Sequence, residues 1–168
     1  MEKSIVSVRN LSHRYSVQWA VKDVSFEINE KGVTGLLGSN GAGKSTTMNI
    51  ICGVLNQTEG DVFINGINLR ENPVEAKKNI GFLPQQPPLY SDLTVGEYLR
   101  HAAFLRLVEP DKVDEAVDVA LAKCSITHFR DRLIKNLSGG YQKRVGIAQA
   151  IVHNPQFVVL DEPTNGLD

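Results

Sequence analysis

One stretch of the sequence decides the fold: Gly38-Ser39-Asn40-Gly41-Ala42-Gly43-Lys44-Ser45. It follows an apolar run at residues 33–37 and precedes a helix-compatible stretch at residues 46–55. A strand, a loop with this glycine and lysine spacing, and a helix are together typical of a phosphate-binding loop. We therefore predict that the chain binds a nucleoside triphosphate.

The residue types in this loop suit a phosphate ligand. Glycines at positions 38, 41 and 43 let consecutive backbone N–H groups turn inward around phosphate oxygens. The helix that follows adds the positive end of its dipole. Lys44 can reach the β- and γ-phosphates, and the Ser45 hydroxyl can coordinate a bridging Mg²⁺. Thr46 can donate a further hydrogen bond to phosphate.

Length and composition restrict the class of protein. The 168 residues suit one domain, and 18 basic against 19 acidic residues leave a net charge of −1. This balance provides no electrostatic footprint for nucleic acid or anionic lipid. No apolar stretch approaches the roughly 20 residues that cross a bilayer, and no secretory segment follows residues 1–4. We expect a cytosolic chain in which Cys52 and Cys124 are small core residues.

The first third of the chain is β-rich. Residues 5–8 and 24–28 alternate apolar and polar side chains. Residues 62–64 lead into an Asn65-Gly66 turn signal, which is followed by residues 67–69. These segments predict an antiparallel layer beside the phosphate loop.

Two apolar runs predict strands of a parallel sheet. Residues 157–160, and residues 33–37 apart from Thr34, are apolar, as expected for strands that are covered on both faces. The second run ends in Asp161 and Glu162, and buried carboxylates are costly unless they are compensated. Because α/β proteins bind ligands at the carboxyl edge of the sheet, Asp161 is predicted to hold Mg²⁺. Glu162 is predicted to polarise the water that attacks the γ-phosphate.

A small helical insertion is predicted at residues 94–135. Three prolines within residues 84–88 indicate a loop before it, and Thr94 suits a helix N-cap. Two apolar helix faces follow, formed by Val95, Leu99 and Ala102 in the first helix and by Val113, Val117, Ala120, Leu121 and Cys124 in the second. These faces are interpreted as core.

A third chemical signal is the turn Leu137-Ser138-Gly139-Gly140, which precedes a helix. Ser138 is expected to cap the helix, and the two glycines expose backbone N–H groups at its positive end. Only residues 154–156 separate this helix from the acid-ended strand, so the two should run antiparallel. The turn is therefore predicted to be a second anion site at the nucleotide edge of the sheet.

The combination resembles the ATP-binding cassette domain of ABC transporters. The phosphate loop, Gln85, the Leu-Ser-Gly-Gly turn, Asp161-Glu162-Pro163-Thr164 and Gly166-Leu167-Asp168 occur in the order typical of that family, over nearly the whole chain. The Leu-Ser-Gly-Gly turn distinguishes this family from most other phosphate-loop ATPases. The resemblance implies an α/β phosphate-loop fold with a RecA-like parallel core sheet, an antiparallel N-terminal layer and a helical subdomain.

The resemblance also implies roles for further residues. Two cassettes pair head to tail, and ATP lies between the phosphate loop of one and Ser138, Gly139 and Gly140 of the other. Tyr15 matches the adenine-stacking aromatic residue. Gln85 matches the glutamine that approaches Mg²⁺ and relays the nucleotide state. Asp168 matches the acid that tunes the dimer interface.

The sequence departs from the family pattern at two places. Tyr141 stands where the family usually has glutamine, which leaves the contribution of that position open. The family also continues beyond the Leu-Asp pair to a further strand, inserted between the phosphate-loop strand and the acid-ended strand, and to a histidine that contacts the γ-phosphate. The sequence is therefore expected to be a cassette fragment with weak hydrolysis on its own. Its parts would be residues 1–93 (β layer and loop core), 94–135 (helical subdomain) and 136–168 (signature helix and acid-ended strand).

The expected function is ATP binding and hydrolysis that powers transmembrane transport. The expected partners are a second cassette and membrane permease subunits at the cytoplasmic face of the membrane, and the ending resembles exporters of the multidrug or lipid-related type. The alternative is a soluble cassette ATPase that acts on ribosomes or DNA. A phosphate-loop kinase gives no reason for the Leu-Ser-Gly-Gly turn. The cargo and the direction of transport stay open.

Overall fold

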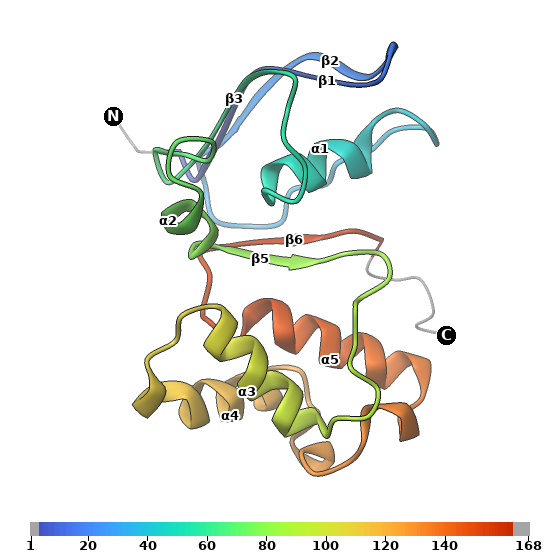
Figure 1. Ribbon diagram of the computed structural model, residues 1–168, viewed down its shortest axis with the longest axis vertical. Helices are drawn as coiled ribbons and strands as arrows, with labels where there is room; N and C mark the ends of the chain where they lie inside the picture. Colours follow the sequence, from blue (N-terminus) through green and yellow to red (C-terminus); the bar gives the residue numbers. More distant parts are fainter. Residues whose placement is uncertain (1–3, 163–168) are drawn as a thin grey trace. The chain divides into compact units, whose positions relative to one another are not determined.

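The structure is a computed structural model that describes residues 4–162. The chain divides between Ile80 and Gly81 into two compact units, which we call the N-terminal unit and the C-terminal unit. Figure 1 labels most of their helices and strands. The sequence motif at residues 163–168, including Gly166, Leu167 and Asp168, lies outside the described residues.

The N-terminal unit contains the predicted antiparallel layer. Four strands lie in the order β2-β1-β3-β4, with bounds Gln18–Ile28, Val6–Tyr15, Glu59–Ile64 and Ile67–Asn68. Every neighbouring pair in this sheet is antiparallel. Asn65 and Gly66 both have positive φ angles, 50° and 76°, as the turn between β3 and β4 requires. The sequence prediction for this layer is confirmed.

Two helices complete the N-terminal unit. Helix α1, Lys44–Ile51, buries Thr47, Ile50 and Ile51 and contacts β2. Helix α2, Pro73–Lys77, is a short helix that begins with proline at its first position, where the missing N–H costs nothing.

The strand predicted at residues 33–37 is wrong. These residues have no regular structure, and the side chains of Val33 and Leu37 are 103% and 92% exposed. Within residues 4–162 no strand pairs with this segment. An apolar run becomes a buried strand only when neighbouring strands bond its N–H and C=O groups and layers cover its faces.

The C-terminal unit pairs two strands far apart in sequence. Strand β5, Ile80–Leu83, starts at the division and lies beside β6, Phe157–Leu160. Figure 1 shows both strands running in the same direction and helix α5, Gly139–Ile151, running opposite to β6. This confirms the predicted helix–strand arrangement. A Cβ at Gly81 would collide with the Ala150 carbonyl oxygen, so glycine permits the close approach of β5 and α5.

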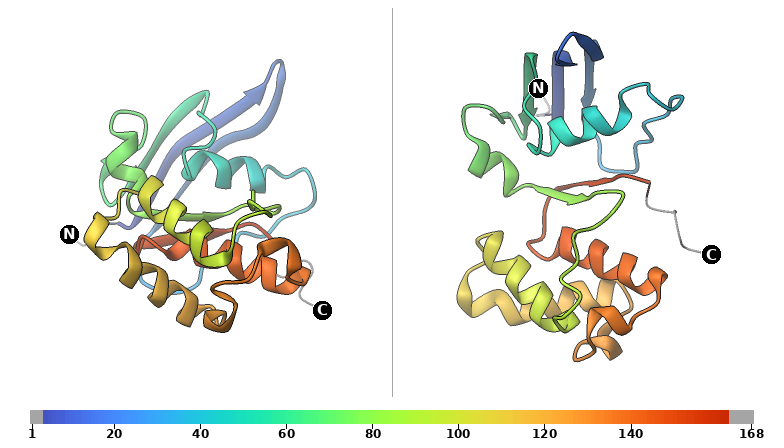
Figure 2. Two further views of the ribbon diagram at one scale, coloured as in Figure 1. Left: turned by 60° about the horizontal axis from the view of Figure 1, so that its bottom comes forward. Right: turned by 45° about the vertical axis from the view of Figure 1, so that its right-hand side comes forward.

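The helical part of this unit forms around an apolar core. Helix α3, Val95–Leu105, and helix α4, Val113–Lys123, pack on each other and on α5, as both views in Figure 2 show. Three short 3₁₀ helices connect them: η1 Pro110–Lys112, η2 Thr127–Phe129 and η3 Ile134–Asn136. The predicted apolar faces are confirmed, because Leu99, Val117 and Leu121 are fully buried in this core.

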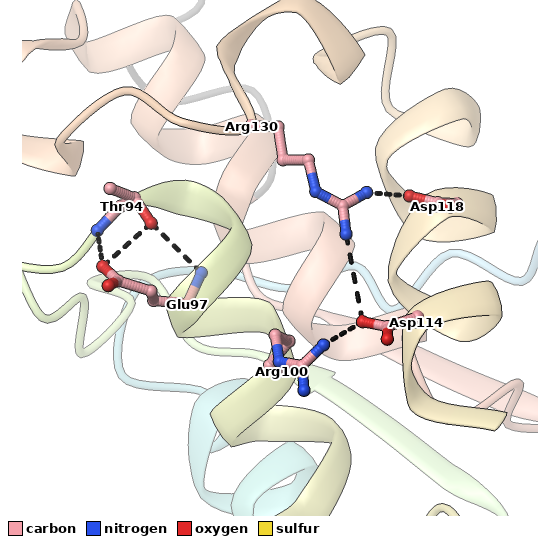
Figure 3. A network of polar contacts seen from close by, with 6 residues as sticks. All are labelled: Thr94, Glu97, Arg100, Asp114, Asp118 and Arg130. Carbon is pink, nitrogen blue, oxygen red and sulfur yellow. Dashed lines mark hydrogen bonds and ion pairs between the residues drawn. The ribbon is translucent and has the colours of Figure 1, made fainter. Parts of the chain in front are cut away.

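Charged side chains connect the outer faces of α3 and α4. Figure 3 shows Arg100 paired with Asp114, and Arg130 paired with Asp118 and Asp114. All four side chains are at least a third exposed, and exposed ion pairs contribute at most about 1 kcal/mol each. The apolar core therefore contributes most of the stability of this helical layer.

Both cysteines are core residues, as predicted. Cys52 is buried at the end of α1, and Cys124 packs partly buried against the helical core. Burial raises the pKa of the Cys124 thiol. Neither cysteine forms a disulfide within residues 4–162. In the part of the chain that the structure describes, no helix has the length and apolarity needed to cross a membrane.

Two leucines of α3, one buried and one exposed, test whether burial in the core determines how much a side chain contributes to stability. Leu99→Ala removes a fully buried side chain from α3, and we expect it to lower the free energy of unfolding by about 2–5 kcal/mol. Leu105→Ala on the same helix, where the side chain is 68% exposed, should change it by less than about 0.5 kcal/mol. Urea denaturation followed by circular dichroism measures both. Equal losses would contradict the core assignment.

The cap of α3 predicts a pH dependence. Thr94 and Glu97 form a capping box, and hydrogen bonds from the Thr94 backbone N–H and then its hydroxyl hold the pKa of Glu97 below its ordinary value of 4.5. A lowered pKa stabilises the fold above the ordinary value, and this stabilisation disappears as pH falls through the lowered pKa.

The neutral variant Glu97→Gln should therefore be less stable than the wild type at pH 7, and the difference should vanish near pH 2. Urea midpoints at the two pH values measure this difference, with Glu115→Gln on α4 as the surface control. A difference that persists at low pH would contradict the charge-based contribution.

Candidate active site

The phosphate loop lies between residue 37 and the first turn of α1. Gly43 is the N-cap of α1 in the left-handed conformation, with φ 89°, and the Ala42 N–H donates to the Ser39 carbonyl over 3.1 Å. The Lys44 ammonium donates to the carbonyl oxygens of Gly38 and Ser39 over 2.7 and 2.8 Å. The lysine side chain therefore folds back over the loop that precedes it.

The start of α1 is suited to an anion. The first helical N–H groups have no partners within the helix, and no acidic residue stands in the first turn. Ser45 is exposed there, and Thr46 is half-buried. The Thr47 hydroxyl donates to the Gly43 carbonyl over 2.9 Å, which ties the helix to the loop. Sequence reasoning missed Thr47, although a hydroxyl four residues after a cap is a signal for such a bond.

Gly43 also sets the position of the loop on the sheet. A Cβ at this residue would collide with the Ala20 carbonyl oxygen of β2 and lie 2.8 Å from Val21 Cγ2. Both the left-handed φ and this close approach require glycine. By contrast, a Cβ at Gly41, whose φ is 82°, would meet no atom within 4 Å.

Tyr15 ends β1 in the same unit. Its side chain is 54% exposed, and its ring meets the His13 ring edge to face, with centroids 4.7 Å apart. An exposed ring held on one edge can stack on a flat heterocycle. The role of Tyr15 toward adenine stays a prediction.

The acidic pair follows β6 directly. The Asp161 N–H donates to the Leu83 carbonyl over 3.0 Å, which extends the β5–β6 pairing to the first acid. Asp161 is 9% exposed, and Glu162 is exposed. This pairing brings the acids beside the segment that follows β5.

Gln85 lies in that segment, two residues after Leu83. Its amide nitrogen donates to Oε2 of Glu162 over 2.9 Å. The structure therefore brings together two residues separated by 77 positions, both of which were singled out from the sequence. The bond orients the Glu162 carboxylate and leaves the amide oxygen of Gln85 as an acceptor.

The signature turn begins α5. Leu137 anchors the turn in the core, whereas Ser138 and Gly139 are exposed. Ser138 is the N-cap, as predicted, but its hydroxyl makes no capping hydrogen bond. Its extended backbone, with φ −63° and ψ 159°, directs the chain into the helix. The exposed N–H groups and the serine hydroxyl are suited to donate to an anion.

Tyr141 faces the helical core. Its ring contacts Phe129 edge to face at 4.7 Å, and the Arg144 guanidinium lies 5.6 Å from the ring centroid. The neighbouring Gln142 amide donates to the carbonyls of Ile134 and Leu137 over 3.3 and 3.1 Å. These contacts anchor the start of α5 to η2 and η3. The sequence alone did not indicate this supporting role for Tyr141 and Gln142.

The donors present fit Mg²⁺. Within residues 4–162 no group of three or more histidine, cysteine or acidic side chains could hold a metal by itself. Magnesium is usually held by one or two carboxylates together with substrate phosphates and water. The Ser45 hydroxyl, the Gln85 amide oxygen and the Asp161 carboxylate are all oxygen donors of the kind that it prefers.

Comparison with known proteins adds independent information. The model of the ABC transporter family matches residues 21–165. The chain is 39% identical over 168 residues to the lipopolysaccharide export system ATP-binding protein LptB of Haemophilus influenzae, covering 98% of this chain and 70% of that protein. It is 37% identical over 164 residues to the uncharacterized ABC transporter ATP-binding protein YxlF of Bacillus subtilis, covering 98% of this chain and 54% of that protein.

Solved structures of ATP-binding subunits of ABC transporters also match this chain. cbiO1 from Clostridium perfringens, part of the ABC transporter complex cbiONQ, matches with a TM-score of 0.85 and 33% identity, over 99% of this chain and 68% of that one. A dimeric post-hydrolysis structure of the ATP-binding cassette MJ0796, bound to ADP and Pi, matches with a TM-score of 0.85 and 30% identity, over 97% of this chain and 76% of that one.

The phosphate loop and the acid-ended strand define a phosphate-loop nucleoside triphosphatase. Because the family model matches most of its residues, the chain belongs to the ABC transporter family, as an ATP-binding domain of its ATPase. The relatives are ATP-binding subunits, and the function shared with them is ATP hydrolysis that powers transport.

The two glycines of the loop provide a matched test. Gly43→Ala should abolish ATP binding, because the added methyl group collides with β2 and displaces the loop. Gly41→Ala meets no atom and adds only left-handed strain of about 1–2 kcal/mol, so affinity should fall about tenfold. Isothermal titration with Mg·ATP measures both. Equal loss in the two variants would show that the approach to β2 does not set the loop.

Proposed function

We propose that this chain binds Mg·ATP at residues 38–46 and hydrolyses it with Glu162 as the general base, in a head-to-tail pair of cassettes that drives membrane permease subunits. The observation that carries this proposal is the hydrogen bond between Gln85 and Glu162 beside Asp161. It is a polar cluster at the carboxyl ends of two parallel strands, where α/β proteins act on their ligands.

The loop supplies binding and charge. Backbone N–H groups of residues 38–43 and the start of α1 surround the phosphates, and Lys44 places its charge at the β- and γ-phosphates. In doing so the Lys44 ammonium exchanges its bonds to the Gly38 and Ser39 carbonyls for phosphate oxygens. Further contacts to the phosphates come from the loop backbone at Ser39, Asn40, Ala42 and Thr46 and from the Thr46 hydroxyl. Tyr15 stacks on the adenine.

The acidic cluster supplies the chemistry. The Glu162 carboxylate, oriented by the Gln85 amide, accepts a hydrogen bond from the attacking water and takes its proton as the γ-phosphoryl group transfers. Ser45, Gln85 and Asp161 would hold Mg²⁺. When bound, the metal neutralises charge that develops on the β- and γ-phosphates.

A second copy of the cassette completes the site. Ser138 and Gly139 are exposed and Gly140 is half-buried at the start of α5, and the first turn of this helix contains no acidic residue. We propose that they bind the γ-phosphate held by the partner. The dimeric MJ0796 structure with ADP and Pi supports such a pair. Loss of the γ-phosphate then removes contacts to both copies and favours opening.

The relatives support a proposal for the partners and the location. LptB is part of an export system, and cbiO1 is part of a transporter complex. We propose that this chain likewise works with permease subunits at the cytoplasmic face of the membrane. The charge balance favours this role over a ribosome- or DNA-acting ATPase.

Replacement of the proposed base separates binding from chemistry. In the protein expressed from its natural gene, Glu162→Gln should lower the hydrolysis rate at least 100-fold, because the amide cannot accept the proton. The Kd for Mg·ATP should change less than threefold. ATP should then hold the pair closed, which sedimentation velocity detects as a dimer.

A second substitution tests the proposed interface between the two cassettes. Ser138→Arg added to Glu162→Gln should abolish the ATP-dependent dimer and leave ATP binding to each monomer intact. Equal loss of binding and hydrolysis in Glu162→Gln alone would sink the assigned role of Glu162. A dimer that persists with Ser138→Arg would sink the assigned role of the signature turn.

A further inference from the structure

A buried lysine lies between the signature helix and the acidic pair. Lys143, on α5, is only 6% exposed, and its ammonium donates to the backbone carbonyl oxygen of Glu162 over 3.2 Å. Lysine is rarely buried unless its charge is satisfied. None of the ion pairs within residues 4–162 includes Lys143, so the Glu162 carbonyl is the partner that the structure shows for its charge.

The backbone of Glu162 needs such support. Its φ is 47°, in the left-handed region that residues other than glycine seldom occupy. Such conformations persist where the surroundings hold them. Contacts at this turn include the hydrogen bond from the Asp161 N–H to the Leu83 carbonyl, the one from the Gln85 amide to Glu162 Oε2, and the one from Lys143 to the Glu162 carbonyl.

We propose that Lys143 is a positioning residue that sets the orientation of the Glu162 carboxylate through its peptide carbonyl. Gln85 holds the side chain of Glu162, and Lys143 holds its main chain, so the carboxylate has one orientation rather than several. The inference rests on the proposed role of Glu162 as the general base.

The same contact has a consequence for coupling between the two sites. Lys143 stands five residues after Ser138 on the helix that the signature turn begins. A shift of α5 when its turn binds the partner's nucleotide would therefore move the ammonium that holds Glu162. The chain thus contains a direct connection from its signature turn to its own general base.

The test uses Lys143→Met, whose unbranched side chain is one atom shorter and has no donor, and Lys143→Arg, which keeps a donor. In the protein expressed from its natural gene, we expect Lys143→Met to lower kcat at least tenfold with KM for ATP within twofold. Lys143→Arg should restore kcat to within threefold of the wild type. Lys135→Met, at a half-exposed lysine, is the control and should leave both constants unchanged.

A double-mutant cycle identifies the residue through which Lys143 acts. If it acts by orienting Glu162, Lys143→Met added to Glu162→Gln should slow single-turnover hydrolysis by less than twofold beyond Glu162→Gln alone. A further tenfold loss, or an unchanged kcat in Lys143→Met by itself, would overturn the proposal. If Lys143 had a merely structural role, Lys143→Met would lower the hydrolysis rate by the same factor in the wild type and in Glu162→Gln.

Two further controls distinguish a folding defect in the Lys143 variants from a failure of the proposed function of Glu162. If Lys143→Met does not fold, Lys143→Gln, whose shorter amide side chain is a weaker donor, enters the same cycle with an expected three- to tenfold loss of kcat. An unchanged kcat there overturns the proposal. If Glu162→Gln hydrolyses ATP at the wild-type rate, the proposed function itself is wrong. If Glu162→Gln is slow but the Lys143 variants keep the wild-type kcat, only the positioning role of Lys143 is wrong.

Discussion

The pairing of β5 with β6 is the constraint on which the acidic site depends. The two strands are separated by more than seventy residues of helix and loop, and the bond from the Asp161 N–H to the Leu83 carbonyl closes that separation. Once this register is set, Gln85 and Glu162 have little freedom in where they lie. The Gln85–Glu162 hydrogen bond and the Lys143 contact then fix the side chain and the main chain of one glutamate.

The phosphate loop depends on a different constraint, which is local. Gly43 adopts a left-handed conformation against the Ala20 carbonyl. The side chains of Thr47 and Lys44 donate hydrogen bonds to backbone carbonyls of the loop. Such a loop is preorganised before any ligand arrives, because neighbouring residues define its backbone. The acidic cluster requires strand pairing, whereas the loop requires only its own turn and one sheet strand beneath it.

The signature turn belongs to the helical core. Leu137, Tyr141 and Gln142 anchor the beginning of α5 to the segment before it, while Ser138 and Gly139 stay exposed. Anchoring the apolar side of a turn while exposing its donors is a requirement for binding a ligand held by another molecule. Tyr141, which stands where the family usually has glutamine, therefore supports the turn from the core and leaves its exposed donors in place.

The sequence by itself determined the local elements: the loop at residues 38–45, the Asn65-Gly66 hairpin, the capping box at Thr94 and the apolar faces of α3 and α4. Each depends on residues within a few positions of one another, so spacing and residue type suffice to predict it. Only the tertiary structure decided that residues 33–37 have no strand in the described part of the chain. It likewise decided that Ser138 makes no capping bond and that Lys143 meets the Glu162 carbonyl. These outcomes depend on partners far away in the sequence, and the pattern of a segment carries no record of which distant groups will satisfy its backbone and its charges.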